Sequence, residues 1–109
     1  MTVDQEVETP KYIYKVLTKE GWEQSVQEKK IVLDALDQAF IHFSKEDQLD
    51  RILGKFFSDT SYVVLRVETD LLVGDLVYET NPGGETKYYH LYNGSIPMDA
   101  CEVVKEGSR

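Results

Sequence analysis

The order of hydrophobic and polar residues along the chain predicts six strands. Runs rich in β-branched and aromatic residues occur at 12–17, 39–43, 62–67, 75–79, 87–92 and 98–104. The run at 62–67 is continuously apolar, which indicates a strand in the centre of a sheet. The segment 33–38 has no clear pattern, so its structure is left open.

Two helices are predicted between these strands. The clearer one has an apolar stripe that repeats at helical spacing, which predicts a buried face made of Leu49, Ile52, Leu53, Phe56 and Phe57. Ser44 stands three residues before Asp47, close to a capping box, and is the candidate N-cap of this helix. The other helix follows Thr18, a candidate N-cap, and places Trp22 and Val26 on one face.

Turn residues separate the later strands. Asn81-Pro82-Gly83-Gly84 predicts a turn between 75–79 and 87–92, because proline presets its first corner and glycine accepts the positive φ of the second. Asn93-Gly94 predicts another turn. Helices come early and strands late, so we predict one α+β domain over 1–109, with a compact mixed sheet and two main helices. Its core is expected within 12–104, with loose ends at 1–10 and 105–109.

The acidic composition disfavours several classes of partner. The formal net charge is −8, with 20 Asp and Glu against 12 Lys and Arg. Nucleic-acid binding requires basic residues that replace phosphate counterions, and the chain has no basic run. DNA, RNA and anionic membrane surfaces are therefore not expected as partners. The oligomeric state is left open.

Cysteine content and hydropathy indicate a reducing compartment. Cys101 is the single cysteine, so an internal disulfide is impossible, and we expect this thiol to be a small buried hydrophobe rather than a nucleophile. The first nine residues are polar and acidic, unlike a signal peptide, and no stretch approaches the ~20 apolar residues of a membrane span. A cytoplasmic location is therefore expected.

The first candidate site lies around His42. Strand alternation puts Phe40, His42 and Ser44 on one face, at the end of a short apolar strand and just before a helix. Ligands of open α/β sheets bind at such strand ends, and helix N-termini attract anions. The alternatives are a structural histidine whose hydrogen bonds are satisfied by the backbone, and a serine that only caps the helix.

The second candidate cluster lies on the predicted hairpin. If the turn closes as expected, one sheet face carries Val77, Glu79, Tyr88, His90 and Tyr92. Glu79 and His90 are then diagonal neighbours, roughly 7–8 Å apart at the backbone. Such a pair suits acid–base chemistry or the orientation of a sugar hydroxyl. The alternative is an ordinary solvated face. Known catalytic motifs and a metal-ligand pattern are absent from the sequence, so no metal is expected.

Several short motifs resemble one protein family. They are Tyr12-Ile13-Tyr14-Lys15, Trp22, Phe40-Ile41-His42-Phe43-Ser44 with Gln48, Leu65-Arg66-Val67, Tyr78-Glu79, Gly83-Gly84, His90-Leu91-Tyr92-Asn93-Gly94 and Ile96-Pro97. Together they are similar to the bacterial "domain of unknown function" family numbered 952, over about 12–104. That family is grouped with the ADP-ribosyltransferase-like superfamily. The resemblance implies a split β-sheet that holds NAD in a cleft.

The resemblance also implies roles for individual residues. His42 matches by position the histidine that holds the ribose, and Glu79 or His90 stands near the late polar position that acts on the oxocarbenium-like state. Tyr14 or Tyr92 would offer a face to the flat nicotinamide ring, and Ser44 would line the ligand site. The chain departs from the family pattern where Asp37-Gln38-Ala39 replaces the usual Asp-Gly, and where Tyr89 replaces a proline.

Two functional hypotheses follow. The first is an enzyme or remnant enzyme that binds NAD or a related nucleotide and transfers or hydrolyses ADP-ribose. In such an acidic chain the phosphates would need dedicated donors, for which Lys15, Arg66 and the helix after Ser44 are the candidates. The second is a non-catalytic module that binds a small polar ligand or a partner protein through the face that carries His42 and His90. A purely structural role is a third, weaker alternative.

Overall fold

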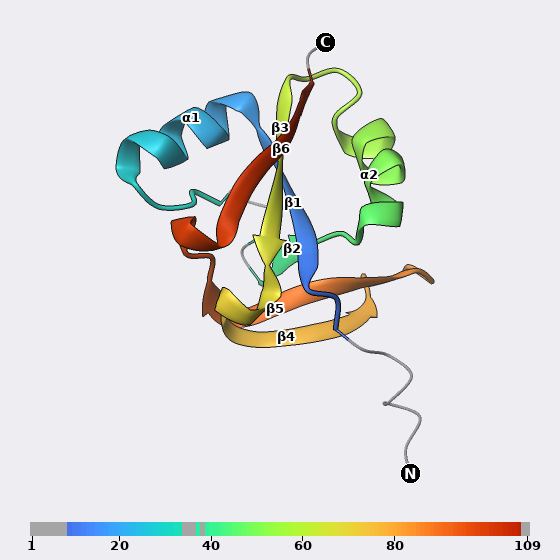
Figure 1. Cartoon of the computed structure of the whole chain (residues 1–109). Helices are drawn as coiled ribbons and strands as arrows, with labels where there is room; N and C mark the ends of the chain where they lie inside the picture. Colours follow the sequence, from blue (N-terminus) through green and yellow to red (C-terminus); the bar gives the residue numbers. More distant parts are fainter. Residues whose placement is uncertain (1–8, 34–36, 38, 108–109) are drawn as a thin grey trace.

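The computed structural model describes residues 9–33, 37 and 39–107. The main elements follow one another as β1 (Tyr12–Thr18), α1 (Lys19–Glu28), β2 (Ile41–Phe43), α2 (Leu49–Phe56), β3 (Tyr62–Glu68), β4 (Val73–Thr80), β5 (Lys87–Ser95) and β6 (Cys101–Gly107) (Figure 1). Short 3-10 turns precede α2, β4 and β6. The predicted α+β class and the two main helices are confirmed. The predicted central position of the strand at 62–67 is also confirmed, because β3 lies between β1 and β6.

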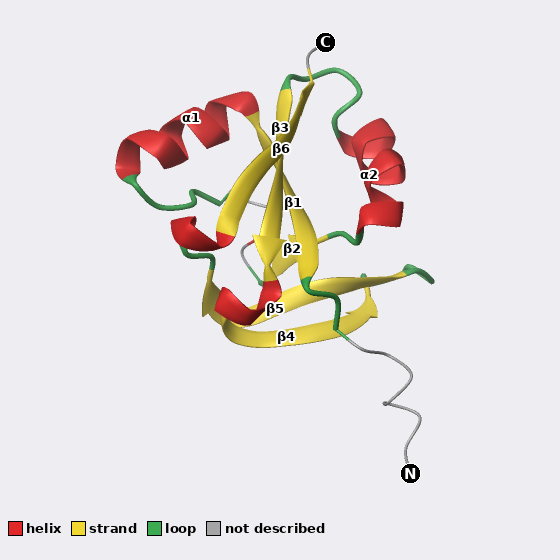
Figure 2. Cartoon of the chain, in the orientation of Figure 1, coloured by secondary structure: helices red, strands yellow, loops and turns green. Residues whose placement is uncertain are grey.

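The strands form two separate sheets rather than one mixed sheet. The first has the order β1-β3-β6 and the second has the order β2-β5-β4. Every paired strand in both sheets is antiparallel. The prediction of mixed pairing was therefore wrong, because local patterns do not show which distant segments pair, whereas a division into two sheets agrees with the split sheet that the resemblance implies. Figure 2 shows the second sheet crossing the lower end of the first, with α1 and α2 on opposite sides of the first sheet.

One pair of residues joins the two sheets by backbone hydrogen bonds. The Tyr14 N–H donates to the Ser44 carbonyl oxygen at 2.7 Å, and the Ser44 N–H donates to the Tyr14 carbonyl oxygen at 2.8 Å. Tyr14 lies in the middle of β1 and Ser44 directly follows β2. This bridge fixes the point at which residues from the two sheets meet.

The hydrophobic core lies between the sheets. Buried side chains alternate along β1 and β2, as expected for strands with one face against the core. The core cluster consists of Ile13, Leu17, Ile41, Phe43, Val63, Leu65, Val67, Tyr89, Leu91, Ile96 and Ala100. Lys15 occupies the position between Ile13 and Leu17 on the same buried face of β1. A charged side chain therefore points where the pattern calls for an apolar one.

Helix α1 begins as predicted but buries its predicted face only in part. The Thr18 hydroxyl accepts a hydrogen bond from the Gly21 N–H at 3.0 Å, which confirms the predicted cap. Trp22 packs against the core, whereas Val26 is 51% exposed, so the face that these two residues share is only partly buried. Ser25 is the buried residue, and its hydroxyl donates to the Gly21 carbonyl and accepts from the Val32 N–H, both at 2.8 Å. These bonds satisfy a polar group that faces the core.

Helix α2 carries the predicted apolar stripe, but most of the stripe is not core. Leu53 is buried, whereas Phe56 is 54% exposed and Ile52 and Phe57 are half-buried. The helix starts at Leu49 after a 3-10 turn. Ser44 is not its N-cap: the side chain of Gln48 instead accepts from the Lys45 N–H at 2.9 Å. The stripe faces a pocket rather than closing onto the sheet.

The two predicted turns had different outcomes. The Asn81 to Gly84 turn is confirmed: Gly83 has φ +79° and the Gly84 N–H donates to the Asn81 carbonyl at 2.9 Å. The predicted Asn93-Gly94 turn was wrong, because both residues lie within β5. There the register shifts between Val73 and Asp75, and the backbones of Gly74 and Gly94 approach closely. Asn93-Gly94 therefore forms a β-bulge in β5, with Asn93 at φ 53°.

Cys101 and the chain ends add three observations. Cys101 is half-buried rather than fully buried, and burial raises the pKa of its thiol to about 11, which disfavours the reactive thiolate. Strand β6 continues to Gly107, beyond the predicted core limit, while 1–8 and 108–109 lie outside the described residues. No helix within the described ranges is long and apolar enough to cross a membrane.

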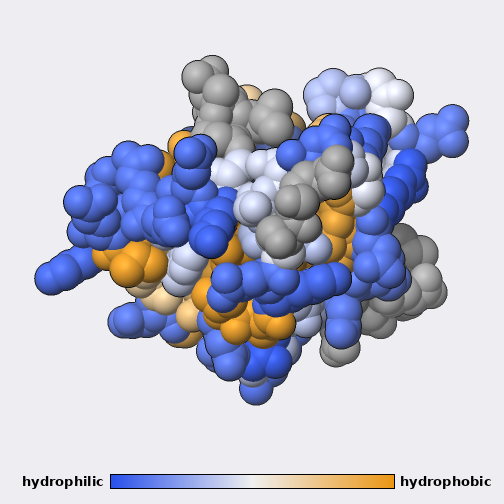
Figure 3. All heavy atoms as spheres, turned by 90° about the horizontal axis from the view of Figure 1, so that it is seen from above, coloured by the Kyte–Doolittle hydropathy of each residue, from blue (hydrophilic) through white to orange (hydrophobic). Residues whose placement is uncertain are grey.

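Seen from above, hydrophobic residues reach the surface in separate patches (Figure 3).

Candidate functional site

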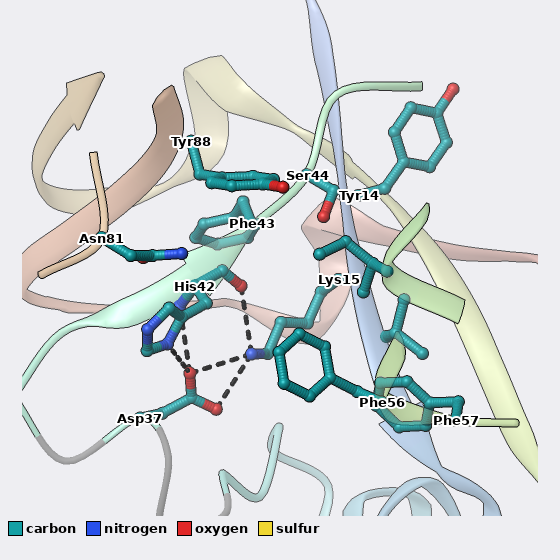
Figure 4. A pocket seen from close by; sticks show the side chains of 12 residues that line it. Tyr14, Lys15, Asp37, His42, Phe43, Ser44, Phe56, Phe57, Asn81 and Tyr88 are labelled. Atoms are coloured by element: carbon teal, nitrogen blue, oxygen red, sulfur yellow. Dashed lines mark hydrogen bonds and ion pairs between the residues drawn. The ribbon is translucent and has the colours of Figure 1, made fainter. Parts of the chain in front are cut away.

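A pocket of about 180 Å³ opens where β1, β2 and α2 meet, next to the bridge between the sheets. Aromatic and aliphatic side chains form most of its wall, and polar groups gather on one side (Figure 4). Its lining residues are Tyr14, Lys15, Val16, Asp37, His42, Phe43, Ser44, Ile52, Phe56, Phe57, Asn81 and Tyr88. The apolar stripe of α2 therefore contributes a wall of this pocket.

A buried ion pair underlies the polar side of the pocket. The Lys15 ammonium donates to both carboxylate oxygens of Asp37, at 3.0 and 2.9 Å, and to the His42 carbonyl oxygen at 3.1 Å. The side chains of Lys15 and Asp37 are 7% and 2% exposed. Buried charges need such partners, because desolvation is otherwise very costly. Lys15 thus ties β1 to the strand that carries His42.

Asp37 holds both the backbone and the ring of His42. Its Oδ1 accepts from the His42 backbone N–H at 3.0 Å and lies 3.0 Å from the ring Nδ1. Burial by itself would raise the pKa of this carboxyl, but the hydrogen bonds from His42 and the charge of Lys15 outweigh burial and lower the pKa to about 2. Asp37 is therefore an anion at neutral pH, and an anion beside Nδ1 fixes the proton there.

The other ring nitrogen of His42 is left for a ligand or solvent. The side chain is 38% exposed, and Nε2 has no hydrogen-bond partner among the described residues. With the proton held on Nδ1, the neutral ring presents Nε2 as an acceptor. The ring therefore combines a fixed orientation with one free polar atom, which is the arrangement of a histidine that binds a substrate or moves a proton.

A second histidine lies directly across from the first. His42 and His90 are partners in the pairing of β2 with β5, and their ring centroids are 5.3 Å apart. His90 is completely buried, with Phe40 stacked on its ring at 4.1 Å. The two histidines lie on one sheet face, as expected from the sequence, but only His42 lines the pocket, so they do not share one open cleft.

The buried ring of His90 connects three polar residues. Nδ1 lies 2.8 Å from Oε2 of Glu79, and Nε2 lies 2.8 Å from Oδ1 of Asn81. The Tyr92 hydroxyl donates to the same Glu79 oxygen. Hydrogen bonds from Tyr92 and His90 lower the pKa of Glu79, and the bond to Glu79 raises the pKa of Tyr92. The predicted diagonal contact of Glu79 with His90 is therefore present in the hairpin.

The predicted site residues thus fall into two groups. Tyr14, His42 and Ser44 line the pocket. Glu79, His90 and Tyr92 do not line it, and their network reaches the pocket through Asn81. Their roles in ligand binding or catalysis stay predictions.

Sequence reasoning missed Asn81 and Tyr88 as members of the wall, and it did not pair Lys15 with Asp37. Tyr88 was assigned only to a sheet face, and Asn81 was read only as a turn residue. Lys15 had a signal, since it interrupts the buried side of β1. The hydrophobic pattern gave no signal for Asp37, which was named only where the chain departs from the family motif.

The expected phosphate donors are all engaged elsewhere. Lys15 is bound to Asp37, and Arg66 pairs with Glu102 and lies over the Tyr12 ring. Helix α2 begins five residues after Ser44, so its N-terminus is not at this serine. The pocket wall therefore contains no unpaired cation among the described residues. No group of three metal-ligating side chains occurs in the described part of the chain either.

Comparison with known proteins places the chain in a family. A family model described as a protein of unknown function, DUF952, matches residues 16–105. The chain belongs to the DUF952 family. This result confirms the family resemblance, while the wider grouping with the ADP-ribosyltransferase-like superfamily stays a prediction. A search of curated proteins finds no match.

Solved structures of a bacterial protein have the same fold. The crystal structure of protein CC0527 from Caulobacter crescentus is 29% identical, with a TM-score of 0.67, and the match covers 89% of this chain and 84% of that chain. The solution NMR structure of CC0527 gives the same identity and TM-score, with 91% and 84% covered. The DUF952 chain described here is therefore similar to CC0527 along most of both sequences.

Proposed function

We propose that this DUF952 protein binds NAD or a related nucleotide by its nicotinamide–ribose end, in the pocket between the two sheets. The observation that carries the proposal is His42, an imidazole fixed by Asp37 on the polar side of a cavity with aromatic walls. The grouping of the DUF952 family with the ADP-ribosyltransferase-like superfamily, which the sequence resemblance implies, supplies the ligand class. The contacts within the pocket then indicate which end of the ligand it fits.

The size of the cavity suits a single ring with an attached sugar edge. An apolar cavity of about 150 Å³ accommodates benzene. The pocket, at about 180 Å³, has room for one flat ring but not for a dinucleotide. The rest of the nucleotide would extend into solvent from the open side.

The charge of the pocket favours the same end of the ligand. The nicotinamide ring of NAD is cationic, and cations bind favourably to aromatic faces. Phe56 and Tyr88 offer aromatic rings in the wall, whereas the ring of Tyr14 points away from the cavity (Figure 4). Because Lys15 is bound to Asp37, the described part of the pocket wall offers no free cation to a phosphate. A net charge of −8 is compatible with a cationic ring and with phosphates held outside.

His42 would hold the ribose. With Nδ1 donating to Asp37, Nε2 accepts a hydrogen bond from a ribose hydroxyl. Ser44 lies on the adjacent wall, and its hydroxyl both donates and accepts. In this arrangement the nicotinamide ring packs against the aromatic walls, and the ribose binds the polar side of the pocket.

Isothermal titration calorimetry with three probes tests the proposal. NAD and nicotinamide mononucleotide should both bind, and ADP-ribose, which lacks the ring, should bind more weakly. His42→Ala should weaken nicotinamide mononucleotide binding by roughly tenfold, the value of one hydrogen bond. Lys105→Ala, an exposed change on β6, should leave the affinity unchanged. Absence of binding by all three probes at millimolar concentration would contradict the proposal.

Cleavage of the bound nucleotide is a second candidate function. The observation that favours it is the same Asp37–His42 pair, which resembles an oriented general base. Water would add to the anomeric carbon, its proton would pass to Nε2, and nicotinamide would leave with the electrons of the glycosidic bond. Chromatographic detection of free nicotinamide from NAD, lost in His42→Ala, would support cleavage. Binding without release would leave the protein as a binding module.

A further inference from the structure

Asn81 has a position in the pocket that its role in the turn does not require. Its backbone closes the hairpin turn, since its carbonyl accepts from the Gly84 N–H at 2.9 Å. Its side chain is free of that task and reaches the pocket wall. The amide nitrogen points into the space between Tyr88 and His42 (Figure 4). Within the described residues this nitrogen has no hydrogen-bond partner.

The orientation of the amide is fixed by the network behind it. The His90 ring lies between two polar groups, with Nδ1 2.8 Å from Oε2 of Glu79 and Nε2 2.8 Å from Oδ1 of Asn81, so the amide oxygen of Asn81 is turned toward the ring. The ring of His90 is fully buried and stacked by Phe40 at 4.1 Å, which prevents it from turning. With its oxygen engaged, the amide can present only N–H groups to the pocket.

We propose that Asn81 is the specificity-determining residue of the pocket, donating its amide N–H to a carbonyl oxygen on the bound ring, with Glu79 and His90 as positioning residues. This inference rests on the proposed function. It deepens that proposal by naming the ring substituent that the pocket selects, a carboxamide or ketone rather than a group without an acceptor. A ligand that leaves this donor without an acceptor binds less favourably, so discrimination of roughly tenfold to a hundredfold is expected.

A pair of ligand analogues isolates the selected oxygen. The acetylpyridine analogue of NAD keeps the carbonyl oxygen and loses the amide nitrogen, whereas thionicotinamide adenine dinucleotide replaces the oxygen by sulfur, a weak acceptor. The wild type should bind NAD and the acetylpyridine analogue alike in calorimetry. It should bind the thio analogue at least tenfold more weakly.

Three variants assign the discrimination to its residues. Asn81→Asp keeps the shape and turn propensity but removes the donor, and Asn81→Ser provides a second variant suited to the turn. Both should bring the ratio of NAD to thio-analogue affinity close to one. Glu79→Gln should lower the same ratio by releasing His90, while the effect of His42→Ala on affinity persists. This ratio, unlike overall affinity, is not altered by a general loss of stability.

The outcomes separate this inference from the proposed function. If the wild type binds NAD but does not distinguish the thio analogue, or if Asn81→Asp keeps the full ratio while melting near the wild-type temperature, the role of Asn81 is refuted and nucleotide binding stands. If the wild type binds none of the three nucleotides at millimolar concentration, both proposals fail. A ratio above ten that collapses in both Asn81 variants supports the inference.

Discussion

Removal of the Asp37 charge should destabilise the fold by about 3–5 kcal/mol, the usual cost of breaking one side of a buried ion pair. Asp37 receives the Lys15 ammonium at 2.9 and 3.0 Å and two N–H groups of His42 at 3.0 Å. Asp37→Asn turns one of these acceptors into a donor and leaves the Lys15 charge buried without a counter-charge. The free energy of unfolding from guanidinium chloride titration measures the loss.

Two further variants show whether the pair or the side-chain volume is responsible. Lys15→Met combined with Asp37→Leu removes both charges, and it should recover the part of the loss that comes from the uncompensated Lys15 charge, while the His42 N–H groups still lack their acceptor. Asp50→Asn, an exposed change on α2, should stay within about 0.5 kcal/mol of the wild type. A loss below 1 kcal/mol in Asp37→Asn would refute the reasoning, since it would mean that water solvates the pair.

The same pair predicts the direction of the pH dependence. The pKa of Asp37 is about 2 in the folded protein and about 3.9 in an unfolded chain, so the unfolded state binds the proton first as the pH falls. The stabilisation is therefore complete above pH ~4 and is lost as the pH falls toward 2. The stability difference between wild type and Asp37→Asn should be constant from pH 7 to 5 and shrink toward pH 2.

Two other substitutions test the packing. Leu53→Ala should cost about 2–5 kcal/mol because Leu53 is the buried residue of α2, whereas Phe56→Ala, at a 54% exposed position, should cost under 1 kcal/mol in the same titration. Equal losses would contradict the assignment of the stripe to the pocket. Gly94→Ala should cost about 1–3 kcal/mol because an added Cβ would lie 1.8 Å from the Val73 carbonyl oxygen. Gly54→Ala, with no atom near its Cβ, should instead stabilise α2 by about 0.5–1 kcal/mol, and destabilisation there would count against the helix geometry.

Local patterns in the sequence predict most elements of this fold. Alternation and β-branched content locate the strands, and the proline and glycines after Asn81 locate the hairpin turn. The pairing of strands that are distant in the sequence is not visible in local patterns. For this reason a mixed sheet was predicted, whereas two antiparallel sheets were found. Asn93-Gly94 misled because the same dipeptide serves a turn or a bulge, and only the partner strand decides between them.

The candidate site was predictable to a similar extent. The hairpin register gives the contact between Glu79 and His90, since cross-strand position follows from the turn. The contacts of Asp37 could not be predicted, because its partners lie on β1 and β2 and its own segment has no periodicity. Ser44 was assigned to a helix cap from its spacing to Asp47, yet its backbone belongs to the bridge with Tyr14. A short polar motif is compatible with several local structures, and tertiary contacts determine which of them forms.

The bridge between Tyr14 and Ser44 uses only main-chain atoms. Side chains at these two positions can therefore change without moving the sheets relative to each other, provided that neither becomes proline, which would remove a donor. The side chains of the pocket wall can therefore change independently of the backbone bridge that positions the two sheets. Homologous chains could exchange wall residues, and with them the ligand, while the joint that positions the wall stays the same.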